Sequence, residues 1–238
     1  MEKQINSRDV YEALANDYIR EDTHWGSDLD LIKTSLDELI KIEPNPKWLD
    51  LGCGAGFHIA AIAELYPEVS IAGVDYARQM LKAAQYKIKK LGLKNISLYE
   101  ADITKEFPEG KYHIMTSLNN AFGNLYVSGA DQNEIRAGIA KKMANALHSK
   151  GCLILSVYNI EKLNAKSQYC SNVAVVENLS DSVKGDLIAE YCNKYKKVLY
   201  YSHWFSEREL RELAKEAGLK IDFLERRMSR FLVRYKKD

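Results

Sequence analysis

Three glycines at alternate positions are the most informative residues of this chain. Gly52, Gly54 and Gly56 follow an apolar run at 48–51 and precede a helical pattern that starts at Phe57. We interpret this pattern as a buried strand that turns sharply into a helix, where residues without a Cβ let the backbone approach a ligand. A dinucleotide-binding turn needs Gly-x-Gly-x-x-Gly, and its third glycine would fall on Phe57. The spacing therefore excludes that turn.

Acidic residues accompany the first three predicted strands. Asp50 lies in the first, Asp75 lies at the end of the second, and Asp102 follows the third. Ligands of a parallel sheet bind beyond the carboxyl ends of its strands, so these acids are expected to face one site. There, Asp75 can accept hydrogen bonds from both hydroxyl groups of a ribose. The alternatives are a helix cap at Asp75 and a solvated Asx-turn at Asp102.

The glycine turn and the three acids together resemble the first motifs of the class I S-adenosylmethionine (SAM)-dependent methyltransferases. The resemblance covers nearly all of residues 46–158 and extends to the closing helix and hairpin. It implies SAM as the co-substrate and methyl transfer as the reaction. The residues that it implies for SAM binding are Asp50, Gly52, Cys53, Gly54, Gly56, Asp75, Tyr76, Asp102, Ile103, Leu118, Asn119, Tyr18 and Trp25.

The segment 117–125 after the fourth predicted strand is similar to a block of the glycine N-methyltransferases and related small-amine enzymes. Asn120 lies where that family's asparagine lies, and Asn119 replaces its glycine. The segment lacks the Pro-Pro-aromatic motif of enzymes that methylate exocyclic base amines. The resemblance therefore implies a small-molecule acceptor, methylated at an amine nitrogen, with Asn120 beside the reacting atoms.

Two other residues complete the catalytic candidates, which are Asn120, His203 and Tyr18. Tyr18 belongs to an N-terminal helical pattern, and in similar enzymes aromatic residues of this region cover the sulfonium, whose charge is attracted to π faces. The alternative for Tyr18 is core packing. His203 adjoins a cluster of aromatic residues and is a candidate general base, with a structural histidine as the alternative. No metal is expected, because the histidines and cysteines lack metal-ligand spacing.

Short apolar runs alternate with helical periodicity after residue 45, which predicts an α/β fold with a Rossmann-like, doubly wound, mostly parallel sheet. The predicted strands are 48–51, 69–74, 96–99, 113–118 and 152–158, and the predicted helices are 77–91 and 131–148. Ser206 begins a capping box whose helix ends at Gly218. Two runs at 220–225 and 230–235 predict an antiparallel C-terminal hairpin.

We expect residues 1–238 to form a single methyltransferase domain. Two segments lie outside the alternation: residues 1–43, expected as an N-terminal helical lid, and residues 159–204, expected as a substrate-side insertion. The chain is 46% hydrophobic and 28% charged with net charge +1, which favours a globular protein and demands no membrane partner. We expect a cytoplasmic protein, present as a monomer or homodimer. The four cysteines include no Cys-x-x-Cys pair.

Two competing hypotheses remain open at this level. One is a SAM-dependent enzyme that modifies tRNA or other RNA, because six basic residues crowd the C-terminus: Arg226, Arg227, Arg230, Arg234, Lys236 and Lys237. The other is a protein that binds SAM without turnover, and Asn119 in place of glycine is the residue that favours it. The bland alternative for the basic residues is a solvated hairpin edge.

Overall fold

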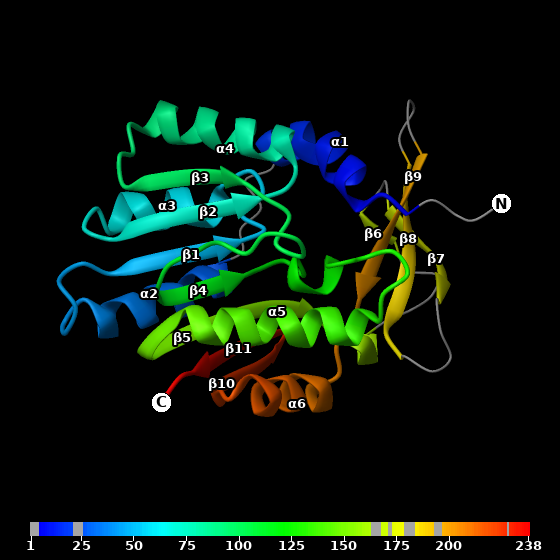
Figure 1. The fold of residues 1–238 in the computed structure, drawn as a ribbon. Helices are drawn as coiled ribbons and strands as arrows, with labels where there is room; N and C mark the ends of the chain where they lie inside the picture. Colours follow the sequence, from blue (N-terminus) through cyan, green and yellow to red (C-terminus); the bar gives the residue numbers. More distant parts are fainter. Residues whose placement is uncertain are drawn as a thin grey trace.

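A seven-stranded sheet forms the centre of the computed structural model, which describes residues 5–20, 26–162, 168–170, 173–178, 184–192, 197–227 and 229–238 (Figure 1). The strand order is β10-β11-β5-β4-β1-β2-β3. The strands are β1 (Lys47–Leu51), β2 (Ser70–Asp75), β3 (Ile96–Glu100), β4 (Tyr112–Ser117), β5 (Leu147–Tyr158), β10 (Lys220–Arg227) and β11 (Arg230–Lys236). The pairs from β5 to β3 are parallel, whereas β11 is antiparallel to both β5 and β10. The predicted fold class is confirmed.

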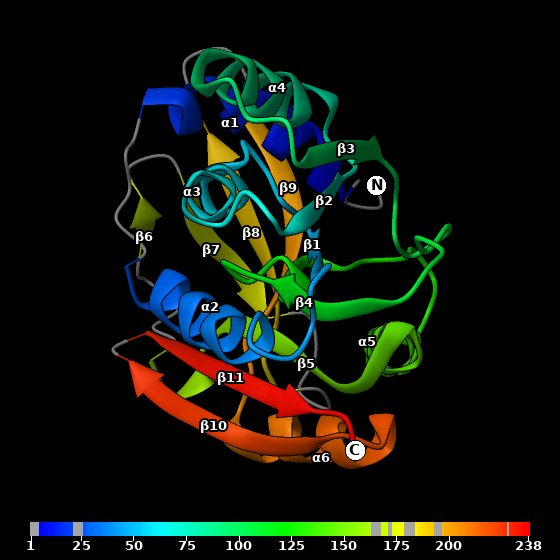
Figure 2. The ribbon, with the colours of Figure 1, turned by 90° about the vertical axis from the view of Figure 1, so that its left-hand side faces the viewer.

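Helices cover both faces of this sheet (Figure 2). One face carries α2 (Gly26–Leu39), α3 (Phe57–Leu65) and α4 (Arg78–Leu91), and the other carries α5 (Gln132–Ala146) and α6 (Glu207–Ala217). On the first face, Ile59 and Ile62 of α3 pack in one buried cluster with Trp48. Fully burying such an aliphatic side chain contributes about 1.5–3 kcal/mol, so the apolar faces of the helices hold the layers together.

The predicted ends of two helices are confirmed. Gly92 and Gly218 end α4 and α6 in the left-handed conformation, with φ of 68° at each, which glycine adopts without a Cβ penalty. The Ser206 hydroxyl accepts from the Glu209 N–H, and the Glu209 carboxylate accepts from the Ser206 N–H, so the predicted capping box begins α6.

A second, four-stranded antiparallel sheet lies beyond the carboxyl ends of the parallel strands (Figure 1). It contains β6 (Gln168–Cys170), β7 (Val173–Asn178), β8 (Asp186–Cys192) and β9 (Lys197–His203). All four strands fall in the segment 159–204, for which the sequence predicted no strands. The four residues from Asp186 to Ala189 are buried in succession, so β8 lacks the polar–apolar alternation that marks a strand with one wet face.

The two N-terminal helices pack against different parts of the fold. Residues of α1 (Ser7–Arg20) contact β9 and α4, and the backbone of Ile5 forms a bridge with Leu199 of β9. By contrast, Leu31, Ile32 and Leu36 of α2 are buried against the large sheet. The prediction that all of residues 1–43 form a lid is therefore corrected: α2 belongs to the helical layer of the fold.

Candidate active site

A cavity of about 680 Å³ lies at the carboxyl ends of the parallel strands. Residues 5–8 and Tyr11 line it from the N-terminal segment, and residues 124–126 line it from the end of η1 (Phe122–Asn124) and the loop that follows. The predicted SAM-binding residues that line it are Asp50, Gly52, Cys53, Gly54, Asp75, Tyr76, Asp102, Ile103, Leu118 and Asn119. No residue of α2 within the described part of the chain lines it.

The three glycines of the turn have different roles. Gly52 and Gly56 have φ of 78° and 74°, and an added Cβ would lie 2.6 Å from the Ala121 Cβ and 2.8 Å from the Ala84 Cβ. These two positions therefore need glycine for packing. At Gly54 an added Cβ would meet nothing within 4 Å, and the residue lines the cavity. The backbone at Gly54 thus leaves open the space that a closely bound ligand needs.

Asp75 closes β2 and fixes the glycine turn. Its Oδ2 accepts a hydrogen bond of 2.8 Å from the Gly54 N–H, and its Oδ1 accepts one of 2.9 Å from the Ala77 N–H at the start of α4. The helix-cap alternative is therefore partly realised, while the carboxylate also lines the cavity. Burial raises the pKa of Asp75 to about 6, although these backbone donors lower it. Hydroxyl donors from a ligand would further stabilise the charged form.

Asp50 is the most deeply placed acid of the cavity. It is 2% exposed, and its Oδ1 accepts a hydrogen bond of 2.6 Å from the Thr116 hydroxyl. The Thr116 oxygen in turn accepts from Trp48 Nε1 at 2.9 Å. Burial raises the pKa of Asp50 to about 7; the Thr116 hydrogen bond opposes this, and the charges of Asp75 and Asp28 add to it. A cationic group bound beside Asp50 would offset that cost.

Asp102 marks the other end of the cavity. Its Oδ1 accepts from the N–H and the hydroxyl of Thr104 at 3.1 and 2.6 Å, and its Oδ2 lies 3.2 Å from Lys105 Nζ. Partial burial raises the pKa of Asp102, but the donors of Thr104 and Lys105 outweigh it and hold the pKa below its usual value. The Asx-turn alternative is thus present, and the same residue lines the cavity beside buried Ile103.

Helix α1 is fastened over the cavity by polar contacts. The Glu12 carboxylate accepts from the Arg78 and Gln79 N–H groups of α4 at 2.7 and 2.8 Å. Arg8 and Arg78 both contact Glu100, at 2.6 and 3.2 Å. Farther along α1, the Tyr11 hydroxyl accepts from Asn124 Nδ2 at 2.5 Å; both residues line the cavity. These contacts hold residues 7–12 of α1 against the cavity, and we refer to this part of α1 as the roof.

Asn120 is a structural residue in this fold. It is fully buried and does not line the cavity, although neighbouring Asn119 does. Its Oδ1 accepts from the Tyr158 N–H at 3.0 Å, and its Nδ2 donates to Ser202 Oγ, to the His203 carbonyl and to Asn124 Oδ1 at 3.1, 3.2 and 3.2 Å. Every polar atom of the amide is engaged, so the predicted contact of Asn120 with reacting atoms does not fit its position.

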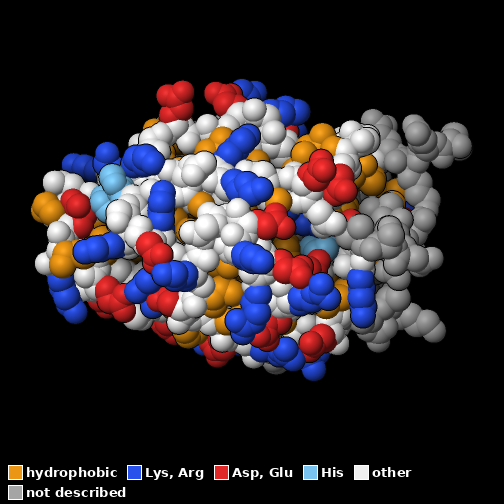
Figure 3. Space-filling model, turned by 60° about the horizontal axis from the view of Figure 1, so that its bottom comes forward, with side chains coloured by type: hydrophobic (Ala, Val, Ile, Leu, Met, Phe, Trp, Pro, Cys, Tyr) orange, Lys and Arg blue, Asp and Glu red, His pale blue; other side chains and the backbone are white. Residues whose placement is uncertain are grey.

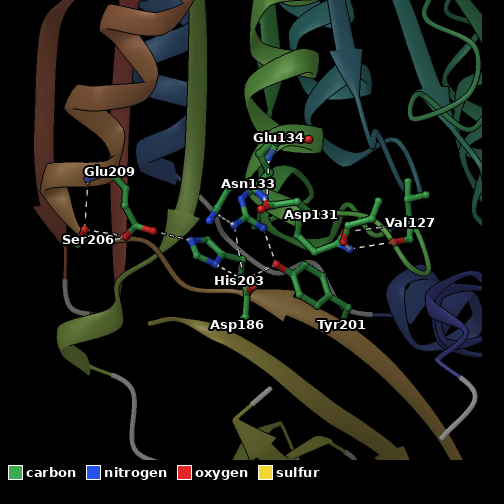
Figure 4. A network of polar contacts seen from close by, with 12 residues as sticks. Val127, Asp131, Asn133, Glu134, Asp186, Tyr201, His203, Ser206 and Glu209 are labelled. Carbon is green, nitrogen blue, oxygen red and sulfur yellow. Dashed lines mark hydrogen bonds and ion pairs between the residues drawn. The ribbon is translucent and has the colours of Figure 1, made fainter. Parts of the chain in front are cut away.

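His203 lies in a buried polar network away from the cavity lining (Figure 4). Its Nδ1 is 2.6 Å from Asp186 Oδ1, and its Nε2 is 3.1 Å from Glu209 Oε1. Tyr201 donates to the same Asp186, and Arg136 donates to Tyr201. Burial raises the pKa of Asp186, but the hydrogen bonds from His203 and Tyr201 outweigh it and lower the pKa overall. With both ring nitrogens beside carboxylates and the residue outside the cavity lining, the position of His203 does not fit the predicted role of a general base.

The remaining predictions have separate outcomes. The side chain of Tyr18 and all of Trp25 lie outside the described residues. Sequence analysis did not select Tyr11 as a site residue, yet Tyr11 lines the cavity, with its ring centroid 6.3 Å from that of Tyr76. It also missed Tyr126, which lines the cavity and stacks on Tyr201 at 5.3 Å. No spacing in the sequence signals Tyr126, because its partner is distant along the chain.

Comparison with known proteins shows the family of this chain. A model described as a methyltransferase domain matches residues 42–218. The carboxy-S-adenosyl-L-methionine synthase of Campylobacter fetus is 28% identical over 182 residues, which cover 75% of this chain and 71% of that protein. The uncharacterized protein MJ0906 of Methanocaldococcus jannaschii is 28% identical over 126 residues, which cover 53% of this chain and 32% of that protein. The chain thus spans about a third of the length of this second relative.

Two solved structures share the fold. A SAM-dependent methyltransferase from Clostridium acetobutylicum has a TM-score of 0.67 at 17% identity, covering 98% of this chain and 99% of that one. SAM-bound CalS10 from Micromonospora echinaspora, an amino pentose methyltransferase, has a TM-score of 0.64 at 17% identity, with 100% of both chains covered. Among the described residues, no helix is long and apolar enough to cross a membrane. With a domain model that matches residues 42–218, the chain belongs to the methyltransferase domain family, and it shares its fold with SAM-dependent methyltransferases.

Proposed function

We propose that this protein transfers the methyl group of SAM to a small-molecule acceptor, at an amine nitrogen, within the cavity under α1. The observation that carries the proposal is the position of Asp75 beside the open face of Gly54 in this cavity. The volume of about 680 Å³ falls in the range of small-molecule sites. We also propose that the acceptor atom is nitrogen and that the chain is related to the glycine N-methyltransferases, which its segment 117–125 resembles.

The residues at the strand ends would bind the donor in a fixed direction. Asp75 would hold the ribose hydroxyls, Asp102 and Ile103 the adenine, and Asp50 with the glycine turn the methionine end. Bound SAM supplies a methyl group activated by a cationic sulfur. In-line displacement then asks the protein chiefly for alignment, which can contribute on the order of 7–11 kcal/mol. Because alignment of donor and acceptor is the main requirement, the site can support methyl transfer without a general base at His203.

The roof supports a closed site for a small acceptor. Helix α1 is held by Glu12 and Tyr11, and β9 lies against it from the second sheet. Such a cover excludes water from the reacting groups, which strengthens electrostatic interactions inside. We therefore propose that α1 and the second sheet together form the predicted lid. The amino pentose substrate of the structural relative CalS10 is consistent with an amine acceptor.

The RNA hypothesis loses its main support in the structure. Arg226 contacts Glu161 and Glu207, at 2.6 and 3.3 Å, and Arg234 contacts Asp222 at 3.0 Å. Lys236 also lies near Asp222, at 3.2 Å. Figure 3 shows Lys and Arg side chains interspersed with Asp and Glu over this face. Because acids neutralise these cations, the hairpin is not a continuous phosphate-binding surface.

The test combines turnover with binding. Purified protein and SAM are incubated with amines, amino acids and metabolite hydroxyls, and S-adenosylhomocysteine (SAH) is measured. We expect SAH formation with an amine, and an Asp75→Asn variant that binds SAH about 10-fold or more weakly by calorimetry, because charged hydrogen bonds to the ribose are lost. Glu225→Gln, on β10 and outside the cavity lining, is the matched control. Binding without turnover across the panel would instead favour the non-catalytic SAM-binding hypothesis.

A further inference from the structure

A polar cluster lies beside the cavity, between the first turns of α2 and α3, the end of β4 and the start of β11. It consists of Asp28, His58, Asn119 and Arg230. Arg230 Nη1 donates to Asn119 Oδ1 at 2.8 Å, and Asp28 Oδ2 lies 3.9 Å from the same nitrogen, at the limit of an ion pair. Both His58 and Asn119 line the cavity. The cluster thus joins the cavity wall to a partly buried cation, Arg230.

His58 carries a polar atom that needs a partner. His58 is only 5% exposed, and its Nε2 has no hydrogen-bond partner among the described residues. Burial, followed by the charges of Arg230 and Lys87, lowers the pKa of His58 to about 3, so the ring is neutral at pH 7 and carries one N–H donor. Buried polar groups are normally hydrogen-bonded, so a ligand group in the cavity would complete this one.

The surroundings favour a negative group as that partner. His58 lies in the first turn of α3, where Gly56 gives no side-chain cap and no acidic residue follows, so the helix N–H groups add a partial positive charge. Because Arg230 holds the oxygen of the Asn119 amide, the NH₂ group of that amide is turned away from Arg230. The positive charges of Arg230 and Lys87 act on His58, whereas the charge of Asp28 raises the pKa of Asp50. Repulsion by these acids is stronger for a doubly charged phosphate than for a singly charged carboxylate.

We propose that His58, Asn119 and the first turn of α3 form a carboxylate-binding subsite, with Arg230 as the positioning residue that orients Asn119. This inference rests on the proposed function, since it concerns the same cavity. Two ligands could bring the same chemistry to it. One is the methionine end of SAM, and the other is an acceptor amine that also carries a carboxylate, such as an amino acid.

Pairs of ligands that differ only in the carboxylate test the subsite. The first pair is SAH and its carboxamide, and the second is an amino acid acceptor and its amide. Binding is measured by calorimetry for wild type, His58→Leu and Arg230→Gln. The matched control is Arg227→Gln, because Arg227 forms its ion pair with Glu225 and its side chain is 45% exposed. Thermal unfolding checks that each variant folds, and two separate positions guard against a variant that does not.

We expect wild type to prefer the carboxylate over the amide by about 10-fold or more in one pair, as hydrogen bonds to a charged group allow. His58→Leu and Arg230→Gln are expected to abolish that preference, and Arg227→Gln to keep it. Preference within the SAH pair assigns the subsite to the donor, and preference within the amino acid pair assigns it to the acceptor. No preference in either pair, or a preference that survives in both folded variants, overturns the subsite. Wild type that binds no SAH but prefers amino acids to amides would refute the proposed function alone.

Discussion

Replacing Asp50 by asparagine is expected to stabilise the protein in alkaline solution while impairing SAM binding. Asp50 is 2% exposed, and its pKa is raised from 3.8 to about 7, chiefly by burial. A carboxyl group whose pKa is raised by folding binds its proton more tightly in the folded state. Its contribution to stability therefore becomes less favourable as the pH rises from the unfolded pKa to the folded one. Asparagine keeps an oxygen that can accept from the Thr116 hydroxyl but carries no charge.

The magnitude follows from the shift of about three pKa units, at 1.36 kcal/mol for each unit. At pH 8 the charged carboxylate lowers the free energy of unfolding by roughly 4 kcal/mol relative to a neutral group. At pH 4 this difference falls below about 1 kcal/mol, because the carboxyl group is then largely protonated in the folded state. For a chain of this length, about 4 kcal/mol corresponds to a Tm change of about 8–16 °C.

Urea unfolding at pH 8 and pH 4 measures this difference, and calorimetry with SAH at pH 8 measures the binding cost. Glu225→Gln, at a half-buried hairpin position whose side chain is 37% exposed, should change stability by no more than about 0.5 kcal/mol at either pH. The reasoning is refuted if Asp50→Asn is no more stable than wild type at pH 8. It is also refuted if its advantage is the same at both pH values, since the effect would then not come from the buried charge.

Three further predictions concern the turn, the last helix and the roof. Gly52→Ala should destabilise the protein by about 1–3 kcal/mol, since its Cβ would lie 2.6 Å from the Ala121 Cβ, whereas Gly54→Ala should chiefly weaken SAH binding. Ser206→Ala should lower the free energy of unfolding by about 1 kcal/mol through loss of the helix cap, seen as a Tm lower by about 2–4 °C. Glu12→Ala should speed hydrogen exchange in α1 about 5-fold, because two acceptors for α4 are lost at about 1 kcal/mol in total.

Each of these has a contradicting outcome. Equal losses of stability in the two glycine variants would mean that the positive φ shared by both positions, 78° at Gly52 and 53° at Gly54, sets the cost rather than the contact with Ala121. An unchanged Tm for Ser206→Ala, with Arg227→Gln as reference, would mean that another group caps α6. Exchange in α1 that Glu12→Ala leaves unaltered would show that packing on β9, rather than the carboxylate, holds the roof.

Local patterns predicted most of the large sheet, because each of its elements has a signal of its own. The glycine turn marked the link from β1 to α3, Gly92 and Gly218 marked two helix ends, and the short link before β11 marked the antiparallel hairpin. The second sheet was missed in part because its strand β8, buried from Asp186 to Ala189, carries no alternation. Strands such as β8 are recognised only by what packs on both of their faces, which the sequence does not record.

The candidate site was predicted unevenly for a similar reason. Asp50, Asp75 and Asp102 stand at strand ends, and topology alone brings strand ends together. The identity of a residue did not reveal the direction of its side chain: Asn119 faces the cavity, while adjacent Asn120 is buried among backbone groups. His203 was attractive by composition, yet its partners Asp186 and Glu209 could be found only in three dimensions (Figure 4).

The amide of Asn120 also has a consequence for how the chain assembles. Its partners Tyr158, Ser202 and His203 follow it by 38, 82 and 83 residues, so this set of hydrogen bonds forms only after most of the polypeptide has been synthesised. A ribosome-bound fragment that ends before β9 would leave a buried amide partly unsatisfied. The two sheets should consequently melt as one cooperative unit, and truncating the second would loosen the first.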